Sequence, residues 1–304
     1  MKFFRYAVFF IKNQLNLTFR FWYDQIEDIQ DQPKVNAMTF DQLISLPDLK
    51  LAQAQLSLPA SWGQGRTVFG GLSAALMLQS MLNQLGDQNR RLLSFSCNFV
   101  GPLLSETPFE LNTQLLRAGK NATQMQTTIT QNDQVCLVAL ACFGKPRSSA
   151  IKVAAKDEST LTEVNHKQTL PYIEGVMPAF IQHIDLNLQQ GAMPFSDASS
   201  SHIGGWMKFK EPAQPHLSVL HLLALADAWP PTLLQLCKGP TPASSMSWYV
   251  EFLDDIELAG TEWFAMEAVT HQAEHGYAIE DAKLFSQDGK LLALSRQTVA
   301  VFDS

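Results

Sequence analysis

The 304-residue sequence predicts an α+β fold of two tandem units, each an antiparallel β-sheet wrapped around a long central helix. Three observations predict it. Two segments are apolar on nearly every side of a helix, each is followed by four strand-like runs, and turn residues recur at matching places in the two sets. Because a helix that is apolar all round must be buried and a sheet has one face to bury, a sheet wrapped around the helix satisfies both.

The predicted central helices are the two apolar segments. The first runs from Gly70 to Gly86, and its last glycine stands where a C-terminal cap belongs. The second runs from Leu217 to Ala228 and is stopped or kinked by Pro230-Pro231, because proline lacks the N–H that a helix needs. Leucine and alanine occupy several faces of both segments, which predicts that both helices are buried.

Eight short runs rich in Val, Thr, Phe and Leu predict the strands. They are Leu92–Phe99, Phe109–Arg117, Thr123–Gln131 and Val135–Phe143 after the first helix, and Ser244–Leu253, Glu262–Thr270, Tyr277–Phe285 and Leu291–Phe302 after the second. Asn132-Asp133 and Asp288-Gly289 lie between the last two strands of each set. This match indicates an internal duplication of one helix and four strands.

The domain organisation follows from these elements. Residues 38–150 form the predicted first unit and residues 173–304 the second. Residues 151–172 between them are polar and without periodicity, which predicts a linker. Residues 1–37 are an N-terminal extension to which the sequence assigns no role, and Met38 is an alternative start of the protein.

The extension contains a short apolar stretch, Ala7–Ile11, behind Lys2 and Arg5. Lys12 interrupts it and no small-residue cleavage site follows, which argues against a secretory signal peptide. An amphipathic surface helix is the alternative interpretation. No run in the sequence reaches the roughly 20 apolar residues that a membrane-spanning helix requires. We therefore expect a cytoplasmic protein without a membrane span.

Composition and charge exclude several classes of protein. The sequence is 46% hydrophobic and 17% charged, which is typical of a globular protein. Its net charge is −7 and it has no Lys/Arg-rich run, so we expect no nucleic-acid partner. No CxxC pair occurs, and we expect buried free thiols in a reducing compartment. The four cysteines are Cys97, Cys136, Cys142 and Cys237.

Most familiar catalytic motifs are absent. Gly71–Ala75 begins like a nucleophile elbow but lacks the second glycine, and the sequence has no P-loop and no GxGxxG. His271 and His275 are four residues apart, as in some metal sites, but polar neighbours and Gly276 favour a solvated turn. We therefore expect neither a metal nor an organic cofactor.

Several short motifs, taken in order from Met38 to the end, resemble the acyl-CoA thioesterase II family. In the first half they are Arg66-Thr67-Val68-Phe69-Gly70-Gly71, Ser96-Cys97-Asn98-Phe99, Leu116-Arg117-Ala118-Gly119-Lys120 and Phe143-Gly144. In the second half they are Gly205-Trp206-Met207, Ala226-Asp227-Ala228, Asp288-Gly289 and Ser295-Arg296-Gln297. The resemblance implies a double hotdog fold and an enzyme that hydrolyses acyl-CoA to free acid and CoA without a cofactor.

The resemblance also implies three catalytic residues, which here are Asp227, Ser245 and Gln297. Asp227 is a lone carboxylate in an apolar run, so burial would raise its pKa toward the range of a general base. The alternative interpretation is that Asp227 caps the segment that begins near Pro230. Gln297 shares a strand face with apolar side chains, and a buried amide must find hydrogen-bond partners in the sheet or in a site.

The hydroxyl of the site has two candidates. Alignment by Phe252 selects Ser245, with serine in place of the family's more usual threonine. Strict strand alternation instead places Ser244 on the apolar face with Trp248 and Phe252. A β-bulge would reconcile the two, and Ser244 remains the alternative.

These residues predict a water activated by Asp227, Ser245 and Gln297. Gly70, Gly71 and Ser244 are candidate substrate-binding residues, because a glycine at a helix N-terminus lets backbone donors approach a ligand. Two rivals remain: a hotdog hydratase or dehydratase, which needs a His/Asp pair, and a non-catalytic acyl-CoA or lipid-binding protein. Edge strands that need cover predict a homo-oligomer.

Overall fold

The computed structural model describes residues 38–87 and 89–302. The predicted extension at residues 1–37 lies outside this part of the chain. In the described part, no helix is long and apolar enough to cross a membrane.

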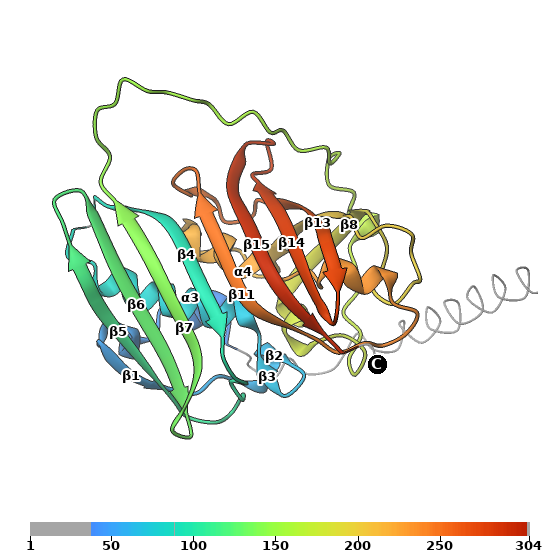
Figure 1. Cartoon of the computed structure of the whole chain (residues 1–304), viewed down its shortest axis with the longest axis horizontal. Helices are drawn as coiled ribbons and strands as arrows, with labels where there is room; N and C mark the ends of the chain where they lie inside the picture. Colours follow the sequence, from blue (N-terminus) through green and yellow to red (C-terminus); the bar gives the residue numbers. More distant parts are fainter. Residues whose placement is uncertain (1–37, 88, 303–304) are drawn as a thin grey trace, which may run out of the picture. The chain divides into compact units, whose positions relative to one another are not determined.

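The long strands of both units join in one antiparallel sheet of eleven strands within the described residues, in the order β1-β5-β6-β7-β4-β11-β15-β14-β13-β9-β8 (Figure 1). They are β1 (Gln53–Leu56), β4 (Arg91–Phe99), β5 (Phe109–Ala118), β6 (Ala122–Gln131), β7 (Gln134–Gly144), β8 (Ile184–Gln190), β9 (Ile203–Phe209), β11 (Ala243–Phe252), β13 (Phe264–Glu274), β14 (Tyr277–Phe285) and β15 (Leu291–Val301). The two units meet where β4 pairs with β11, with Cys97 opposite Trp248. The predicted α+β double hotdog fold is confirmed.

All eight predicted strands are present, and the largest shift is at the end of β13, which reaches Glu274 rather than Thr270. The predicted hairpin turns are also present: Asn132 and Asp133 have φ values of 53° and 59°, and Gly289 has a φ of 85°. Strands β1, β8 and β9 were not predicted. Four two-residue strands were also missed: β2 (Gly63–Gln64), β3 (Thr67–Val68), β10 (His216–Leu217) and β12 (Leu258–Ala259).

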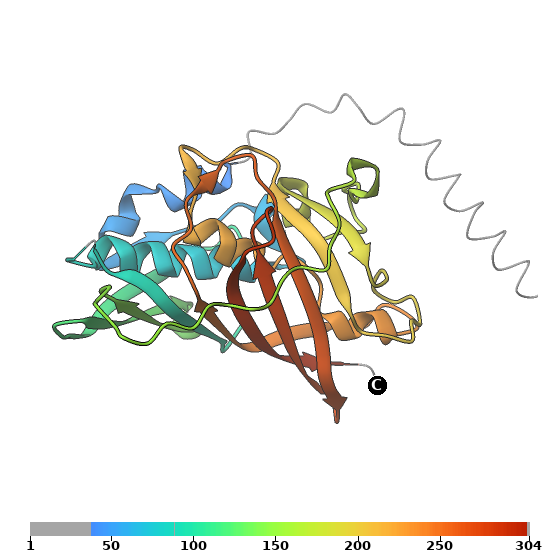
Figure 2. The ribbon, with the colours of Figure 1, turned by 90° about the horizontal axis from the view of Figure 1, so that it is seen from above.

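The central helices α3 (Gly70–Gln84) and α4 (Val219–Leu225) lie on the same side of the sheet and pack against each other (Figure 2). Helix α3 is buried along most of its length, as predicted. Its predicted end was wrong, because the cap is Leu85 in an extended conformation and Gly86 does not take the left-handed conformation of a capping glycine.

Helix α4 is shorter than the predicted Leu217–Ala228. Its first turn is closed at Ser218, whose backbone N–H donates to His221 Nδ1 at 3.1 Å. After Leu225 the chain tightens, since the N–H groups of Asp227 and Ala228 donate to carbonyls three residues back. The two prolines that follow lead into a short 3₁₀ helix, η5 (Thr232–Leu236). Asp227 therefore follows the end of α4 rather than lying within it.

A short helix near the start of the described chain is tied to α4. Helix α2 (Phe40–Ile44) was not predicted, although Thr39 and Gln42 form a capping box at its start. The carboxylate of Asp41 pairs with Nε2 of the buried His221 at 3.0 Å. This contact links the N-terminal segment of the first unit to the central helix of the second.

The same β-bulge occurs in both units. In β4 the register against β7 shifts between Leu92 and Ser94, and in β11 the register against β15 shifts between Ser245 and Ser247. A bulge reverses the alternation of side chains on the strand that carries it. The duplication predicted from the turns therefore extends to the irregularities of the strands.

Residues 151–172 contain no long strand or helix, and from Glu158 onward they lie against the second unit (Figure 1). Glu158 forms a bridge with Lys290, and the Ser159 hydroxyl and Thr160 N–H donate to the carboxylate of Glu267 at 2.9 and 2.6 Å. The boundaries of the linker and of the two units stay predictions.

All four cysteines are free thiols. Cys97 and Cys136 are buried as predicted, but Cys142 and Cys237 are only half-buried. Burial raises the pKa of the Cys97 thiol, and the neighbouring charge of Asp227 raises it further.

The two central helices approach most closely at Gly71. A Cβ there would lie 2.3 Å from the carbonyl oxygen of Ala224 and 2.5 Å from the ring of Phe69. No side chain fits between the two backbones, so this position requires glycine.

We expect Gly71→Ala to lower the free energy of unfolding by about 1–3 kcal/mol, because the added methyl group overpacks the crossing of α3 and α4. Gly86→Ala is the matched control, since a Cβ at Gly86 meets nothing within 4 Å. It should change stability by less than about 0.5 kcal/mol. Urea denaturation of both variants makes the comparison, and equal midpoints would contradict it.

Candidate active site

A cavity of about 780 Å³ lies between the two units. Strands β2 and β3 and the N-terminus of α3 line it from the first unit. The segment after α4, the start of β11 and Gln297 of β15 line it from the second. All three predicted catalytic residues and Gly70 and Ser244 line this cavity. Most of the other lining residues are apolar, so the cavity combines a small polar cluster with an apolar wall.

Asp227 is partly buried at the junction of the units, with its carboxylate against the start of α3. The amide Nε2 of Gln297 donates to its Oδ1 at 3.1 Å, and the backbone N–H of Gly71 donates to the same carboxylate. Its Oδ2 lies 2.7 Å from the place where a Cβ of Gly70 would stand. The glycine at the start of α3 thus makes room for a carboxylate from the other unit.

The pKa of Asp227 is raised from 3.8 to about 7. Burial is the cause, because it disfavours the charged form of a carboxyl group. The hydrogen bonds from Gln297 and Gly71 act in the opposite direction and stabilise the carboxylate. The N-terminus of α3, which lies beside Asp227, carries a partial positive charge that also stabilises the carboxylate. A carboxyl group with a pKa near 7 can exchange a proton at neutral pH.

A chain of two hydrogen bonds runs from Ser245 through Gln297 to Asp227. The hydroxyl of Ser245 donates to Gln297 Oε1 at 3.4 Å, and the amide nitrogen of Gln297 then faces Asp227. Gln297 lies on β15 opposite Trp248 of β11. The serine thus favours one of the two orientations of the glutamine amide.

The bulge in β11 decides which serine faces the cluster. Met246 is the extra residue and is 44% exposed, while Ser245 is half-buried and Trp248 is buried. Strict alternation, which grouped Ser244 with Trp248, was wrong at this point because the bulge reverses the phase. Ser244 is exposed at the edge of the cavity, and its hydroxyl donates to the carbonyl of Ser245 at 3.4 Å.

Glu280, rather than Asp227, caps the segment after the two prolines. The N–H groups of Thr232 and Leu233 each donate to the Glu280 carboxylate at 3.0 Å. The capping interpretation of Asp227 was therefore wrong, and its two hydrogen bonds lead to the first unit and to β15 instead.

The first unit has no counterpart of this cluster. The bulge in β4 places Leu92 where Ser245 stands in β11, and the pairing of Phe95 with Ala141 matches that of Trp248 with Gln297. Both equivalents are apolar. Within the described residues, the duplicated fold carries these polar side chains once.

The two histidines singled out in the sequence lie away from the cavity. His271 pairs with the carboxylate of Asp281 at 2.8 Å, and the largely exposed His275 lies in the turn between β13 and β14 with a φ of 56°. His275 lies in the predicted solvated turn, whereas His271 lies within β13. The residues that the structure describes contain no group of three or more side chains suited to a metal ion.

Arg66 is a cavity residue to which the sequence analysis gave no role. It lines the cavity from the turn between β2 and β3, and its side chain is exposed. The signal was present, since Arg66 opens the motif that runs into Gly70 and Gly71.

Residues 58–144 match the acyl-CoA thioesterase N-terminal domain, and residues 157–301 match the acyl-CoA thioesterase C-terminal domain. The chain belongs to the acyl-CoA thioesterase family. It is therefore a thioester hydrolase, and the family resemblance stated from the sequence is confirmed. The family implies an acyl-CoA substrate for this thioesterase.

Solved structures show the same fold. A putative thioesterase II from Thermobifida fusca matches this thioesterase with a TM-score of 0.70 and 19% identity, over 88% of this chain and 98% of that one. A hot dog fold protein of unknown function from Alicyclobacillus acidocaldarius matches with a TM-score of 0.69 and 22% identity, over 84% of this chain and 96% of that one. Acyl-CoA thioesterase II TesB2 from Mycobacterium marinum matches with a TM-score of 0.66 and 18% identity, over 88% of this chain and 99% of that one. No curated protein matches the sequence.

The raised pKa of Asp227 predicts a pH-dependent stability. Because its pKa of about 7 in the folded protein exceeds 3.8, the folded state holds more protons between these values, and stability declines as the pH rises from about 4 to about 7. Asp227→Asn removes this titration. The unfolding free energy of the variant relative to the unmodified protein should therefore rise by up to about 1.4 kcal/mol per pH unit in this range. Denaturation curves at pH 5, 6, 7 and 8 measure it, and a constant difference would contradict it.

Proposed function

We propose that this thioesterase hydrolyses acyl-CoA to the free acid and CoA by means of a water molecule activated by Asp227. The observation that carries the proposal is the directed chain from Ser245 through Gln297 to a buried carboxylate whose pKa is raised to about 7. Such a group can take a proton from water at neutral pH and return it in the same turnover.

The reaction has two steps. In the first, a water on the cavity side of Asp227 gives its proton to the carboxylate as its oxygen attacks the thioester carbonyl carbon. In the second, the tetrahedral intermediate expels the CoA sulfur as the C–S bond breaks, and the proton on Asp227 goes to the sulfur. One water and one thioester give one acid and one thiol, and Asp227 ends as it began.

Gln297 and the N-terminus of α3 assist Asp227 from opposite sides. Gln297 holds Oδ1 by its amide nitrogen, and Oδ2 lies beside Gly70 at the start of α3. The start of α3 stabilises negative charge through its dipole, first on Asp227 and then on the oxyanion that forms close by.

The apolar wall of the cavity suits an acyl chain. It includes Phe99, Leu103, Leu137, Phe180, Ile181, Leu186 and Leu188, which come from both units. Burial of a methylene against such a surface contributes about 0.8 kcal/mol, so the wall supplies binding energy that grows with chain length.

The hydratase or dehydratase alternative is not favoured by the cavity. Those enzymes need a histidine beside the carboxylate, and no histidine of the described residues lines the cavity that contains Asp227. Two histidines of the described residues pair with an aspartate, and neither lines that cavity: His221, which pairs with Asp41, is buried, and His271 pairs with Asp281 on β14.

The central test is release of free thiol from acyl-CoAs of graded chain length. We expect hydrolysis by the unmodified protein, with kcat/KM rising as the pH passes about 7, because the carboxylate is the active form of the base. Asp227→Asn should lower kcat by at least about 100-fold while it still binds acyl-CoA. A folded Asn variant with full activity would disprove the role of Asp227, and absence of thiol release by the unmodified protein would disprove the proposed function.

A pair of serine variants tests which hydroxyl serves the site. Ser245→Ala removes the donor that orients Gln297 and should lower kcat about tenfold, the effect of one hydrogen bond. Ser244→Ala should have a smaller effect, because that hydroxyl contacts only the carbonyl of Ser245 among the described residues. Ser245→Thr should retain most of the activity of the unmodified protein, since threonine keeps the hydroxyl. A larger loss for Ser244→Ala than for Ser245→Ala would reverse the assignment.

A further inference from the structure

Two charged side chains line the main cavity within the described residues, Asp227 and Arg66. They occupy different environments: Asp227 is partly buried and Arg66 is exposed. Asp227 has two hydrogen-bond donors, whereas Arg66 has no hydrogen bond or ion pair with any described residue. Its guanidinium is therefore an unpaired, exposed cation, and no other cation of the described residues lines this cavity.

The backbone around Arg66 is held firmly. Gly65 takes a φ of 66° in the turn between β2 and β3, and the Thr67 hydroxyl closes the turn onto the carbonyl of Gln64 at 3.0 Å. The N–H of Val68 donates to Leu103 at 2.8 Å, and that of Phe69 donates to Trp62 at 2.9 Å. Arg66 thus has a fixed position relative to the start of α3, while its side chain reaches into solvent.

The spacing between Arg66 and the reacting group suits a long carrier arm. Gly70, beside which Asp227 lies, is the fourth residue after Arg66, and four residues of extended chain span at most about 14 Å. An extended pantetheine arm is of comparable length, and it carries a phosphate at the end away from its sulfur. With the thioester at Asp227, that phosphate would lie within reach of a cation at the cavity rim.

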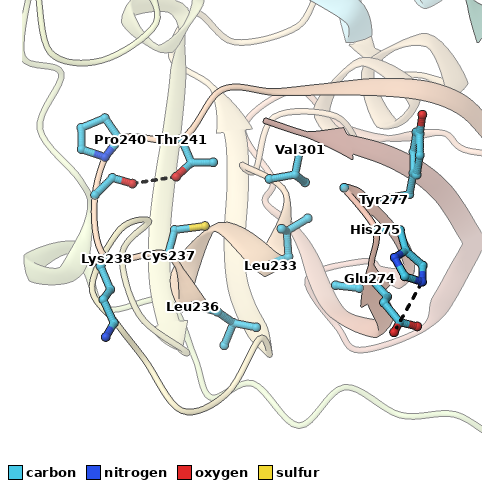
Figure 3. Close-up of a pocket in the computed structure, with 13 residues that line it drawn as sticks. Leu233, Leu236, Cys237, Lys238, Pro240, Thr241, Glu274, His275, Tyr277 and Val301 are labelled. Atoms are coloured by element: carbon cyan, nitrogen blue, oxygen red, sulfur yellow. Dashed lines mark hydrogen bonds and ion pairs between the residues drawn. The ribbon is translucent and has the colours of Figure 1, made fainter. Parts of the chain in front are cut away.

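A second cavity provides the rival position for the phosphate. It has a volume of about 570 Å³ and is lined by η5, by the segment that follows it and by the turn between β13 and β14 (Figure 3). Lys238 lies on one side and the ion pair of His275 with Glu274 on the other. This cavity contains none of Asp227, Ser245 and Gln297, and the Glu274 carboxylate would repel a phosphate there. The geometry therefore favours Arg66.

We propose that Arg66 binds the phosphate that follows the pantetheine arm of the substrate, and that this contact makes the thioesterase prefer phosphorylated carriers to unphosphorylated ones. The proposal rests on the proposed function, because it places the thioester at Asp227. Arginine suits the task, since its planar guanidinium can give two parallel hydrogen bonds to phosphate oxygens.

The test compares three thioesters of one acyl group: acyl-pantetheine, acyl-4′-phosphopantetheine and acyl-CoA. We expect the unmodified protein to show a kcat/KM about tenfold higher for acyl-phosphopantetheine than for acyl-pantetheine, the effect of one charge-assisted hydrogen bond at an exposed site. Arg66→Gln should reduce this ratio to about one. Added salt should lower the ratio in the unmodified protein, because exposed charges are screened.

Lys238→Gln is the matched control, since it removes a cation from the second cavity alone. It should leave the ratio as it is in the unmodified protein. A ratio that survives in Arg66→Gln, or one that collapses in Lys238→Gln instead, would overturn the proposal. An equal loss on all three thioesters in Arg66→Gln would also overturn it, because Arg66 would then act without the phosphate.

These outcomes separate the role of Arg66 from the proposed function. If the unmodified protein hydrolyses none of the three thioesters, the proposed function fails. If it hydrolyses all three without preference for the phosphate, only the role of Arg66 fails.

Discussion

The contact between the carboxylate of Asp227 and the start of α3 organises the whole structure around it. A buried charge is costly unless hydrogen-bond donors face it, and here the donors come from two separate parts of the chain. Gly71 supplies a backbone N–H from the first unit, and Gln297 supplies an amide from the last strand of the second. Neither unit alone could satisfy this group. The site therefore requires the two units side by side.

The close approach of the backbones depends on two adjacent glycines with different tasks. At Gly71 the missing side chain lets α3 and α4 cross against the carbonyl of Ala224, and at Gly70 it leaves room for the carboxylate itself. Because α4 ends at Leu225 and the chain then tightens, Asp227 arrives at the N-terminus of the partner helix. If α4 had continued as a regular helix, the carboxylate of Asp227 would point in another direction.

Local patterns in the sequence predicted most of the sheet but not its edges. The eight strands of the duplicated core have clear apolar runs between turn residues, and turns such as Asn132-Asp133 took the expected conformation. Strand β1 was missed because it is only four residues long. Strand β9 contains Gly204 and Gly205, which weaken any strand pattern. Gly205 is needed there because the ring of Trp229 packs where its side chain would be.

The sequence predicted which residues form the candidate site, but not the hydrogen bonds between them. Asp227, Ser245 and Gln297 were selected through a family resemblance, and their hydrogen bonds depend on contacts between residues far apart in the chain. Strict alternation misplaced Ser244 because the bulge at Met246 has no local signature, although the equivalent bulge in β4 shows that it belongs to the duplicated fold. Similarly, the sequence of neither helix alone predicts that Gly71 of α3 donates a hydrogen bond to Asp227.

The duplicated fold carries the polar cluster in one unit, although both units share the same strand geometry. A second buried carboxylate in the first unit would need its own donors at the start of α4, and that helix begins instead with a turn closed by Ser218 and His221. The buried His221 is in turn held by Asp41 of the first unit. The two helix starts thus have different partners: one receives a carboxylate, and the other is closed by its own side chains. Divergence at the helix starts, together with the apolar Leu92 and Ala141 in the sheet, leaves the described part of this double hotdog with one such polar cluster.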